Sequence, residues 1–360
     1  MNEKMKKGES RGPYFAATNS GKGFVSFFDS VFEKPTVRKR YIIKGGPGTG
    51  KSSFMRQVAD YAINHGSRVE HYRCSSDPDS LDGILIDGQI ALLDGTAPHS
   101  EDTKLPGTRD EILNLGAFWD GEALEASYDR IRLLDGKKRE AYRKAYRFLS
   151  ACMEVEEVNR SLLSTCIREE KMRRAVHRLC DGLPKGTEYS VETCLTDSIG
   201  MKGAVHFDSL EREATTLYQI EESFGSASFY LAFLAEEAKR KQCNIRVSYD
   251  PICPDRLRAL LFCDFGICFV ARESGNVSEK GERVNMKRFL DMNAFSHVRH
   301  ELRANRKLKE ALLASATDAL QEAGDYHFAL EQIYVSCMDF DAEAKYLTAF
   351  CEHTLQKQLS

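Results

Sequence analysis

Short apolar runs and helical spacing alternate in the first third of the chain. An apolar run at residues 41–43 leads directly into a glycine-rich turn. Apolar side chains then recur at three- and four-residue spacing over residues 53–63, which predicts a helix that ends at residues 64–66. Further strands are predicted at residues 68–74 and 90–93. This order of strand, turn, helix and strand is typical of a parallel βαβ unit.

The middle of the chain, residues 122–179, is predicted to be helical. It contains no proline, no glycine follows Gly136 within it, and apolar side chains recur at three- and four-residue spacing. The segment ends at residues 181–184, Asp-Gly-Leu-Pro, which is a strong helix stop. We therefore expect one long helix or a helical hairpin.

The second half of the chain repeats the order of elements of the first. Residues 202–209 echo residues 22–30 when one gap is allowed, and Pro254-Asp255 matches Pro78-Asp79. The predicted elements return in the same order, with a strand at 217–220, a helix at 229–239, and strands at 247–249 and 267–270. A helical tail closes both halves. This shared order predicts two tandem modules.

The glycine-rich turn has the spacing of a Walker A phosphate-binding loop, G-x-x-x-x-G-K-S. Glycines allow main-chain N–H groups to point inward around a phosphate, and the following helix adds its positive N-terminal end. Lys51 supplies charge to the β- and γ-phosphates, and the Ser52 hydroxyl is suited to Mg²⁺. The expected nucleotide-binding residues are Gly45, Gly46, Pro47, Gly48, Thr49, Gly50, Lys51, Ser52 and Ser53.

Two carboxylates and one histidine are candidates to complete a catalytic site with Lys51. Asp94 ends the apolar strand at 90–93, as a Walker B residue does, and is expected to hold Mg²⁺ together with Ser52, although it can also be a turn cap. Asp77 can position water or accept a proton, or can be an ordinary turn residue. His99 can sense the γ-phosphate, or can be a solvated loop residue.

The second module lacks the residues that define the phosphate site. Aligned without gaps, it replaces Lys51, Asp77 and Asp94 by Ala227, Cys253 and Val270. The retained Asp79 is therefore expected to be a structural turn or cap residue. We expect an α/β fold of tandem parallel-sheet P-loop NTPase modules, the second degenerate and packed against the first. The expected domains are a tail at 1–22, a P-loop module at 23–120, a helical appendage at 121–184, a degenerate P-loop-like module at 185–295 and a second helical appendage at 296–360.

Composition and cysteine usage narrow the class of protein. Among 360 residues, 42% are hydrophobic and 29% charged, which is typical of a folded globular chain. The formal net charge of −3 gives no sign of a globally basic nucleic-acid binder. Eleven cysteines without any C-x-x-C pair favour reduced thiols in the cytoplasm. No apolar run approaches the roughly 18 residues of a membrane span, so we expect no membrane partner.

The motifs favour ATP over GTP. The run Thr103-Lys104-Leu105-Pro106 lacks the aspartate of a guanine-reading motif. The sequences at residues 44–52, 74–83 and 93–99 resemble a family of poorly characterised bacterial ATPases that contain two tandem P-loop modules. The resemblance covers most of the chain and is sharp between about Gly23 and Trp119. It implies ATP binding by the matching loop. In that family both halves often have P-loop character, whereas here the second half lacks the lysine.

Three functions remain in competition. The favoured one is a Mg²⁺-dependent ATPase that moves a helical appendage or a protein partner. The second is a phosphotransferase for a nucleotide or another small molecule, with Asp77 as the base and residues 122–179 as a lid. The third is a switch in which ATP orders the interface between the halves without turnover. The basic stripe at residues 137–147 can contact a polyanion or the phosphates, but its interleaved acids favour a solvated helix face.

Overall fold

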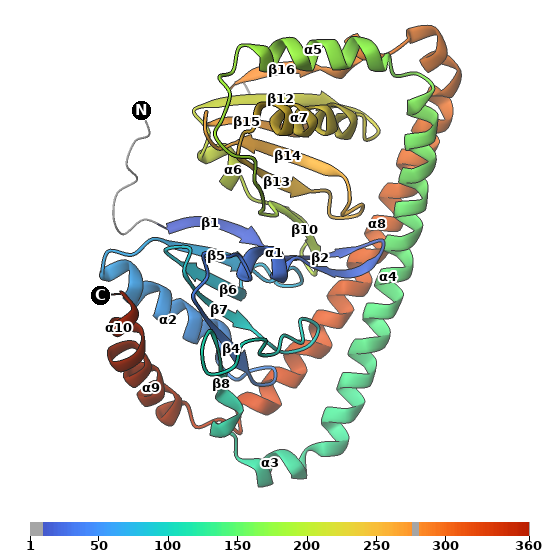
Figure 1. Cartoon of the computed structure of the whole chain (residues 1–360). Coiled ribbons are helices and arrows are strands. Elements are labelled where there is room, and N and C mark those ends of the chain that lie inside the picture. Colours follow the sequence, from blue (N-terminus) through green and yellow to red (C-terminus); the bar gives the residue numbers. More distant parts are fainter. Residues whose placement is uncertain (1–9, 276–280, 360) are drawn as a thin grey trace.

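Two six-stranded mixed sheets, each flanked by helices, make up the computed structural model, which describes residues 10–275 and 281–359 (Figure 1). The first sheet has the strand order β1-β5-β6-β7-β4-β8. Its strands are β1 (Ser10–Phe15), β4 (Lys39–Lys44), β5 (Val69–Arg73), β6 (Leu81–Ile86), β7 (Ile90–Asp94) and β8 (Asp110–Asn114).

The second sheet, read in the direction β9-β13-β14-β15-β12-β16, has the same order. Its strands are β9 (Val191–Thr193), β12 (Thr216–Glu222), β13 (Ile245–Tyr249), β14 (Leu257–Phe262), β15 (Ile267–Glu273) and β16 (Glu282–Asn285). In each sheet three neighbouring pairs are parallel and two are antiparallel. The α/β class is confirmed, but the sheets, expected to be parallel, are mixed with a majority of parallel pairs. The turn between β5 and β6 is too short for a parallel crossover, so β6 pairs antiparallel, as does its counterpart β14.

Side chains alternate between two cores along each strand. In β4, Tyr41 and Ile43 pack towards α2 (Lys51–Asn64), which carries Phe54 and Val58 in the same core. Ile42 instead faces a core that contains residues of both sheets. The two sheets therefore pack face to face through a shared apolar layer, and α7 (Ala227–Lys241) covers the outer face of the second sheet. Each sheet, with the helix on its outer face, is called a module below.

One hairpin extends from each module to the other. The first comprises β2 (Ala17–Ser20) and β3 (Gly23–Ser26), and the second β10 (Asp197–Gly200) and β11 (Gly203–His206). At their tips the N–H of Gly21 donates to the Ile252 carbonyl and that of Met201 to the Ser76 carbonyl, each at 3.0 Å. The short helices α1 (Phe28–Phe32) and α6 (Ser209–Arg212) follow the hairpins.

The expected tail at residues 1–22 is wrong from residue 10 onwards, because β1 begins at Ser10 and β2 at Ala17. Tyr14 and Phe15 are fully buried, because β1 pairs with β5 and a bridge joins Phe15 to Leu195. Both partners are distant in sequence, so the local pattern gives little sign of this strand. Residues 1–9 lie outside the described part of the chain.

The helical appendages are exchanged between the modules. The first consists of α3 (Gly121–Ala126), α4 (Tyr128–Ser164) and α5 (Glu169–Asp181). The second consists of α8 (Met292–Val335), α9 (Phe340–Ala349), a π-helical segment (Phe350–Leu355) and α10 (Gln356–Leu359). The long helices α4 and α8 run antiparallel, so each carries its short terminal helices to the opposite module (Figure 1). Among the described residues, no helix is both long and apolar enough to cross a membrane.

Backbone hydrogen bonds fix this exchange in the same way at both ends. The Asp120 N–H donates to the Cys337 carbonyl at 2.8 Å, and the Asp291 N–H donates to the Cys166 carbonyl at 2.7 Å. Consequently α5 packs on α7 of the second module, while the segment after α8 packs in the α2 core of the first. The sequence pattern predicts the helices but not which module each of them covers.

Candidate phosphate-binding site

Residues 45–50 form the loop between β4 and α2. Strand β4 pairs in parallel with β7, and Ile43 lies opposite Asp94, so the loop and Asp94 emerge at the same edge of the sheet. Gly48 and Gly50 have φ values of 70° and 77°, which strongly favour glycine. Helix α2 begins at Lys51, directly after this turn. The strand, loop and helix are thus arranged as the sequence predicts.

The Lys51 ammonium group lies over its own loop. Its Nζ donates to the Gly46 carbonyl at 2.8 Å and to the Gly45 carbonyl at 3.3 Å. It also lies 3.6 Å from Oδ2 of Asp94, and both side chains are largely buried. A phosphate oxygen would be a stronger partner for this ammonium group than a neutral carbonyl.

Ser52 and Asp94 provide oxygen atoms from neighbouring elements. The Ser52 hydroxyl accepts a hydrogen bond from the Leu81 N–H at 3.0 Å. Oδ1 of Asp94 accepts from the N–H and the hydroxyl of Thr96 at 2.8 and 2.6 Å, and Oδ2 faces Lys51. Hydroxyl and carboxylate oxygens are the ligand types that Mg²⁺ prefers, so this donor set fits the ion chemically. The hydrogen bonds from Thr96 show that Asp94 also caps the turn that follows β7.

The remaining loop residues differ in their surroundings. Thr49 is buried and its hydroxyl donates to the Gly46 carbonyl at 3.0 Å. Ser53 is exposed at the start of α2. Pro47 lines a cavity of about 290 Å³ between the first turns of α4 and the last turns of α8. Tyr128, Arg132 and Lys138 are among the other residues that line this cavity.

Asp77 has the contacts of a turn residue. Its carboxylate accepts from the Asp79 N–H at 3.3 Å and from the Ser80 hydroxyl at 2.7 Å. Asp79 is exposed and forms an ion pair with Lys202 on the second hairpin. Its counterpart Asp255 pairs with Lys22 on the first hairpin at 3.5 Å. The retained aspartate thus links each module to the hairpin of the other, which agrees with a structural role for Asp79.

His99 lies in a buried pair with Asp82, a residue that the sequence reasoning missed. Its Nε2 is 3.2 Å from Oδ2 of Asp82, and both side chains are only 5% exposed. The imidazole stacks on Phe28 with ring centroids 4.2 Å apart. Burial opposes its charged form, but the Asp82 carboxylate outweighs this effect and raises the pKa of His99. His99 is therefore not a solvated loop residue. Among the described residues, none of residues 45–52 forms a hydrogen bond or ion pair with it.

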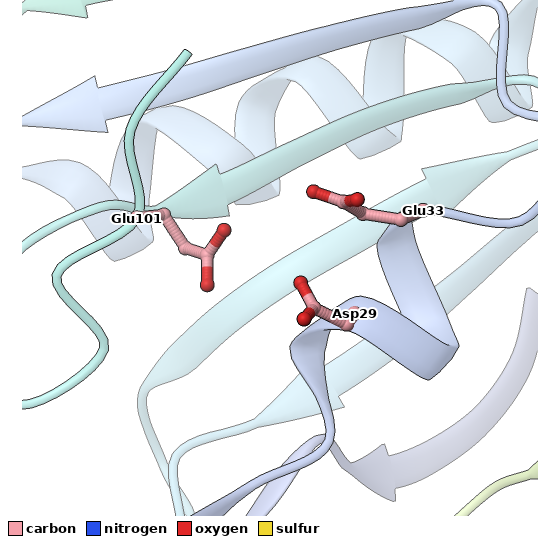
Figure 2. A group of neighbouring side chains, drawn as sticks. All are labelled: Asp29, Glu33 and Glu101. Atoms are coloured by element: carbon pink, nitrogen blue, oxygen red, sulfur yellow. The ribbon is translucent and has the colours of Figure 1, made fainter. Parts of the chain in front are cut away.

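Charged side chains hold the segment that follows Asp94 in position. Lys44, the residue before the loop, donates through Nζ to the Gly95 carbonyl at 2.8 Å and to that of Glu101. Oxygen atoms of Asp29, Glu33 and Glu101 converge within 4.8 Å of one another (Figure 2). Acidic groups of this kind are common without an ion, so their proximity alone does not indicate a metal site.

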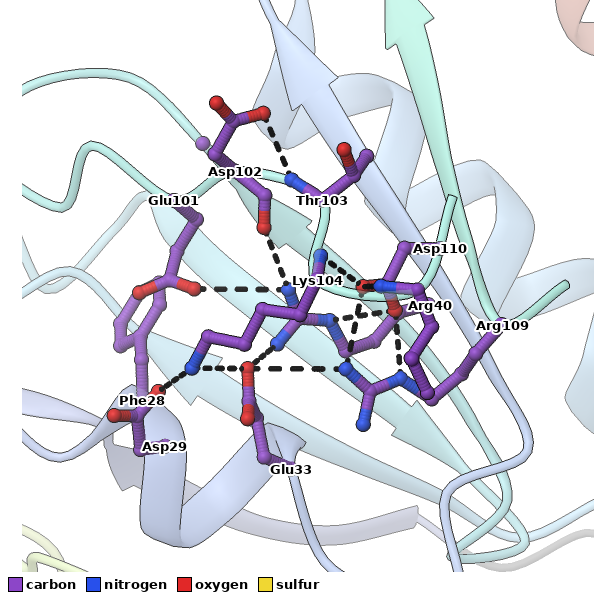
Figure 3. A network of polar contacts seen from close by, with 12 residues as sticks. Phe28, Asp29, Glu33, Arg40, Glu101, Asp102, Thr103, Lys104, Arg109 and Asp110 are labelled. Atoms are coloured by element: carbon purple, nitrogen blue, oxygen red, sulfur yellow. Dashed lines mark hydrogen bonds and ion pairs between the residues drawn. The ribbon is translucent and has the colours of Figure 1, made fainter. Parts of the chain in front are cut away.

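Cations already neutralise these three carboxylates (Figure 3). The fully buried Arg40 pairs with Glu33 and lies 3.8 Å from Glu101, while Lys104 lies 3.0 Å from Asp29. We therefore assign the cluster a structural role. Burial disfavours the ionised form of Asp110, but hydrogen bonds from Arg109 and two backbone N–H groups hold the pKa of this carboxyl well below its usual value.

Helices of the C-terminal appendage contact the loop on its outer side. A Cβ on Gly46 would lie 3.2 Å from Trp119 and 3.4 Å from Tyr334 of α8. A Cβ on Gly48 would lie 2.7 Å from the Glu331 carbonyl. A Cβ on Gly50 would lie 2.6 and 2.7 Å from the two carboxylate oxygens of Glu343 in α9. No local sequence signal points to the contacts with Tyr334, Glu331 and Glu343, because these residues lie near the other end of the chain.

The corresponding loop of the second module, residues 223–226, has no lysine. Its register matches the ungapped alignment, since Gln219 lies opposite Val270 as Ile43 lies opposite Asp94. The N–H of Ala227, the first residue of α7, donates to the Glu222 carboxylate at 3.1 Å. Burial raises the pKa of Glu222. Glu222 thus places a carboxylate at the N-terminus of α7, which corresponds to the position expected to bind phosphate in the first loop.

Comparisons with known protein families, with curated proteins and with solved structures found no match.

Proposed function

We propose that this protein is an ATP-binding P-loop NTPase that hydrolyses ATP with Mg²⁺ and thereby changes the position of its helical appendages. The observation that carries the proposal is the arrangement of Lys51, whose ammonium lies on the carbonyls of Gly45 and Gly46 and 3.6 Å from Asp94. This ammonium group, glycine-rich turn and helix N-terminus together form an anion-binding arrangement. The same proposal interprets the two sheets of equal strand order as tandem P-loop modules, the second degenerate.

Each residue of the loop has a distinct role in this proposal. Main-chain N–H groups of the loop bind the β-phosphate, and Lys51 exchanges its carbonyl partners for β- and γ-phosphate oxygens as negative charge develops there. Ser52 and Asp94 hold Mg²⁺, which when bound neutralises charge on the phosphates. The buried pair of His99 and Asp82 is the better candidate to orient a water molecule, because the Asp77 carboxylate is engaged in its own turn.

A non-hydrolysing ATP-dependent switch is the second candidate. The contacts of Glu331 and Glu343 with the loop favour it, since nucleotide binding and the position of α8 and α9 are then linked. A kinase would use the cavity beside Pro47 for its acceptor. We propose a cytoplasmic location in each case, supported by the eleven free cysteines.

Phosphate release from ATP, measured with Mg²⁺ and no added acceptor, tests the proposal in the wild type and in Lys51→Ala. Steady release that the substitution abolishes supports the ATPase. Stoichiometric binding without turnover favours the switch, and turnover that requires an added nucleotide or sugar acceptor favours the kinase. No binding of ATP by calorimetry, with Mg²⁺ present, would overturn all three.

A further inference from the structure

Glu343 of α9 places a carboxylate directly against the phosphate loop. Its two oxygens are within 2.7 Å of the position that a Cβ on Gly50 would take, and Gly50 immediately precedes Lys51. The residue is 8% exposed. The acid therefore lies beside the loop residues that a triphosphate would contact.

The surroundings of this acid do not stabilise its charge. Among the described residues, no hydrogen-bond donor or cation is paired with the Glu343 carboxylate, and burial raises its pKa. Burying a carboxyl group without a hydrogen-bond or ion-pair partner costs free energy of folding. Glu331 of α8 lies nearby on the same loop, where the Gly48 N–H donates to it.

Aromatic packing holds α9 in this position. Tyr346 lies against Phe118 with ring centroids 5.7 Å apart, and Phe350 lies against Tyr41 at 4.9 Å. Near the end of the chain, Gln358 donates to the Tyr41 hydroxyl at 2.7 Å. Since Tyr41 is on β4, the strand that leads into the loop, α9 and the loop are attached to the same element.

We propose that the Glu343 side chain is an internal competitor of the triphosphate, so that its docking on the loop and nucleotide binding exclude each other. The inference rests on the proposed function, because it concerns the same loop. Two like charges cannot share a partly buried site without a large repulsion. Bound nucleotide therefore expels Glu343 and loosens α9, and by linkage a partner that draws α9 away increases the affinity for nucleotide.

Calorimetric titration of the full chain with ATP and Mg²⁺ tests this proposal in Glu343→Gln, which keeps the shape of the side chain and removes its charge. We expect an affinity about tenfold higher than in the wild type, as removal of one like charge from a partly screened site predicts. Glu343→Met is a second variant that removes the charge by a different side chain. Glu352→Gln, an exposed acid on the following π-helical segment, is the matched control and should leave the affinity unchanged.

Hydrogen exchange of residues 340–359 provides a second measurement. ATP should accelerate exchange in this segment of the wild type, and should accelerate it less in Glu343→Gln, because bound phosphate does not repel the neutral amide. Equal affinities of wild type and both Glu343 variants, with binding still dependent on Lys51, would overturn the inference and leave the proposed function intact. Unchanged affinity with lost turnover would also overturn it, since Glu343 would then act in the reaction. Absence of binding in every variant would overturn both.

Discussion

The two loops that follow β4 and β12 occupy equivalent places in sheets of the same topology, yet their chemistry differs. The first loop comprises residues 45–50, whereas the second comprises only 223–226, because β12 extends two residues further along its aligned register. The first leaves an ammonium group on weak carbonyl acceptors. The second satisfies the first N–H of its helix with Glu222.

The space beside the second loop is filled with paired charges. Lys309 lies 2.6 Å from Glu156, and Arg256 lies 3.9 Å from the same carboxylate and also pairs with Glu157. The cavity that remains there measures only about 60 Å³. The shared topology therefore does not by itself leave the helix N-terminus available to an anion, because the residues at the loop decide this.

The largest expected effect is on the stability of the filled site. Glu156→Gln leaves Lys309 and Arg256 without their shared buried partner, so we expect the free energy of unfolding to fall by about 3 kcal/mol. Urea denaturation measures this change. Glu157→Gln removes an exposed partner of the same arginine and should cost about 1 kcal/mol or less. Equal losses in the two variants would contradict the idea that a buried ion network replaces the ligand.

Ligand affinity should depend on the lysine of the first loop alone. Lys51→Ala should weaken ATP binding by between about tenfold and about a hundredfold, the range for loss of a hydrogen bond to a charged group. The reciprocal change Ala227→Lys should create no second site, because Glu222 lies at the helix N-terminus and would pair with the new cation. The number of nucleotides bound per chain, measured by calorimetry, distinguishes one binding site from two. Two bound nucleotides in Ala227→Lys would show that the second loop had lost only its lysine.

A pH effect on stability is expected from His206 of the second module. Burial lowers the pKa of His206, but its hydrogen bonds with Asp197 and Glu211 prevail and raise this pKa from 6.5 to about 9. The folded state thus holds the proton more tightly than the unfolded state. The associated stability is complete below about pH 6.5 and is lost as the pH rises through about 9.

Urea midpoints recorded between pH 6.5 and 9 test this expectation, with His206→Gln as the comparison. The variant should show a flatter profile over this range. The aligned end of the first hairpin carries Ser26, which does not titrate there, so Ser26→Ala should leave the profile unchanged. The same slope in wild type and His206→Gln would assign the effect to other groups.

The smallest effects should come from the two exchanged ion pairs, Lys22 with Asp255 and Lys202 with Asp79. All four side chains are about half exposed or more, so solvent and salt screen them. Asp79→Asn and Asp255→Asn should therefore both unfold within error of the wild type at high salt. A clear loss in only one of them would show that the two module contacts are not equivalent.

Much of the local structure could be predicted from the sequence. The strand, loop and helix around Lys51 are present, and the strands expected at 217–220, 247–249 and 267–270 lie within β12, β13 and β15. In the first sheet the predictions missed β1, β6 and β8, and in the second sheet they missed the counterparts β9, β14 and β16. β6 follows directly after a turn of polar residues, while β1 acquires its burial from strands that are distant in sequence.

The sequence by itself determined the position of the glycine-rich loop, the order of its main elements in both halves and the absence of a lysine from the second loop. These features depend on local periodicity and on turn residues with special backbone angles, which neighbours along the chain specify. Only the tertiary structure decided that α4 and α8 exchange their ends, that Asp82 meets His99 and that Glu343 lies on Gly50. Contacts of this kind arise from the packing of apolar faces that are distant in sequence. The residues next to a carboxylate in the sequence therefore do not indicate where such packing will place it.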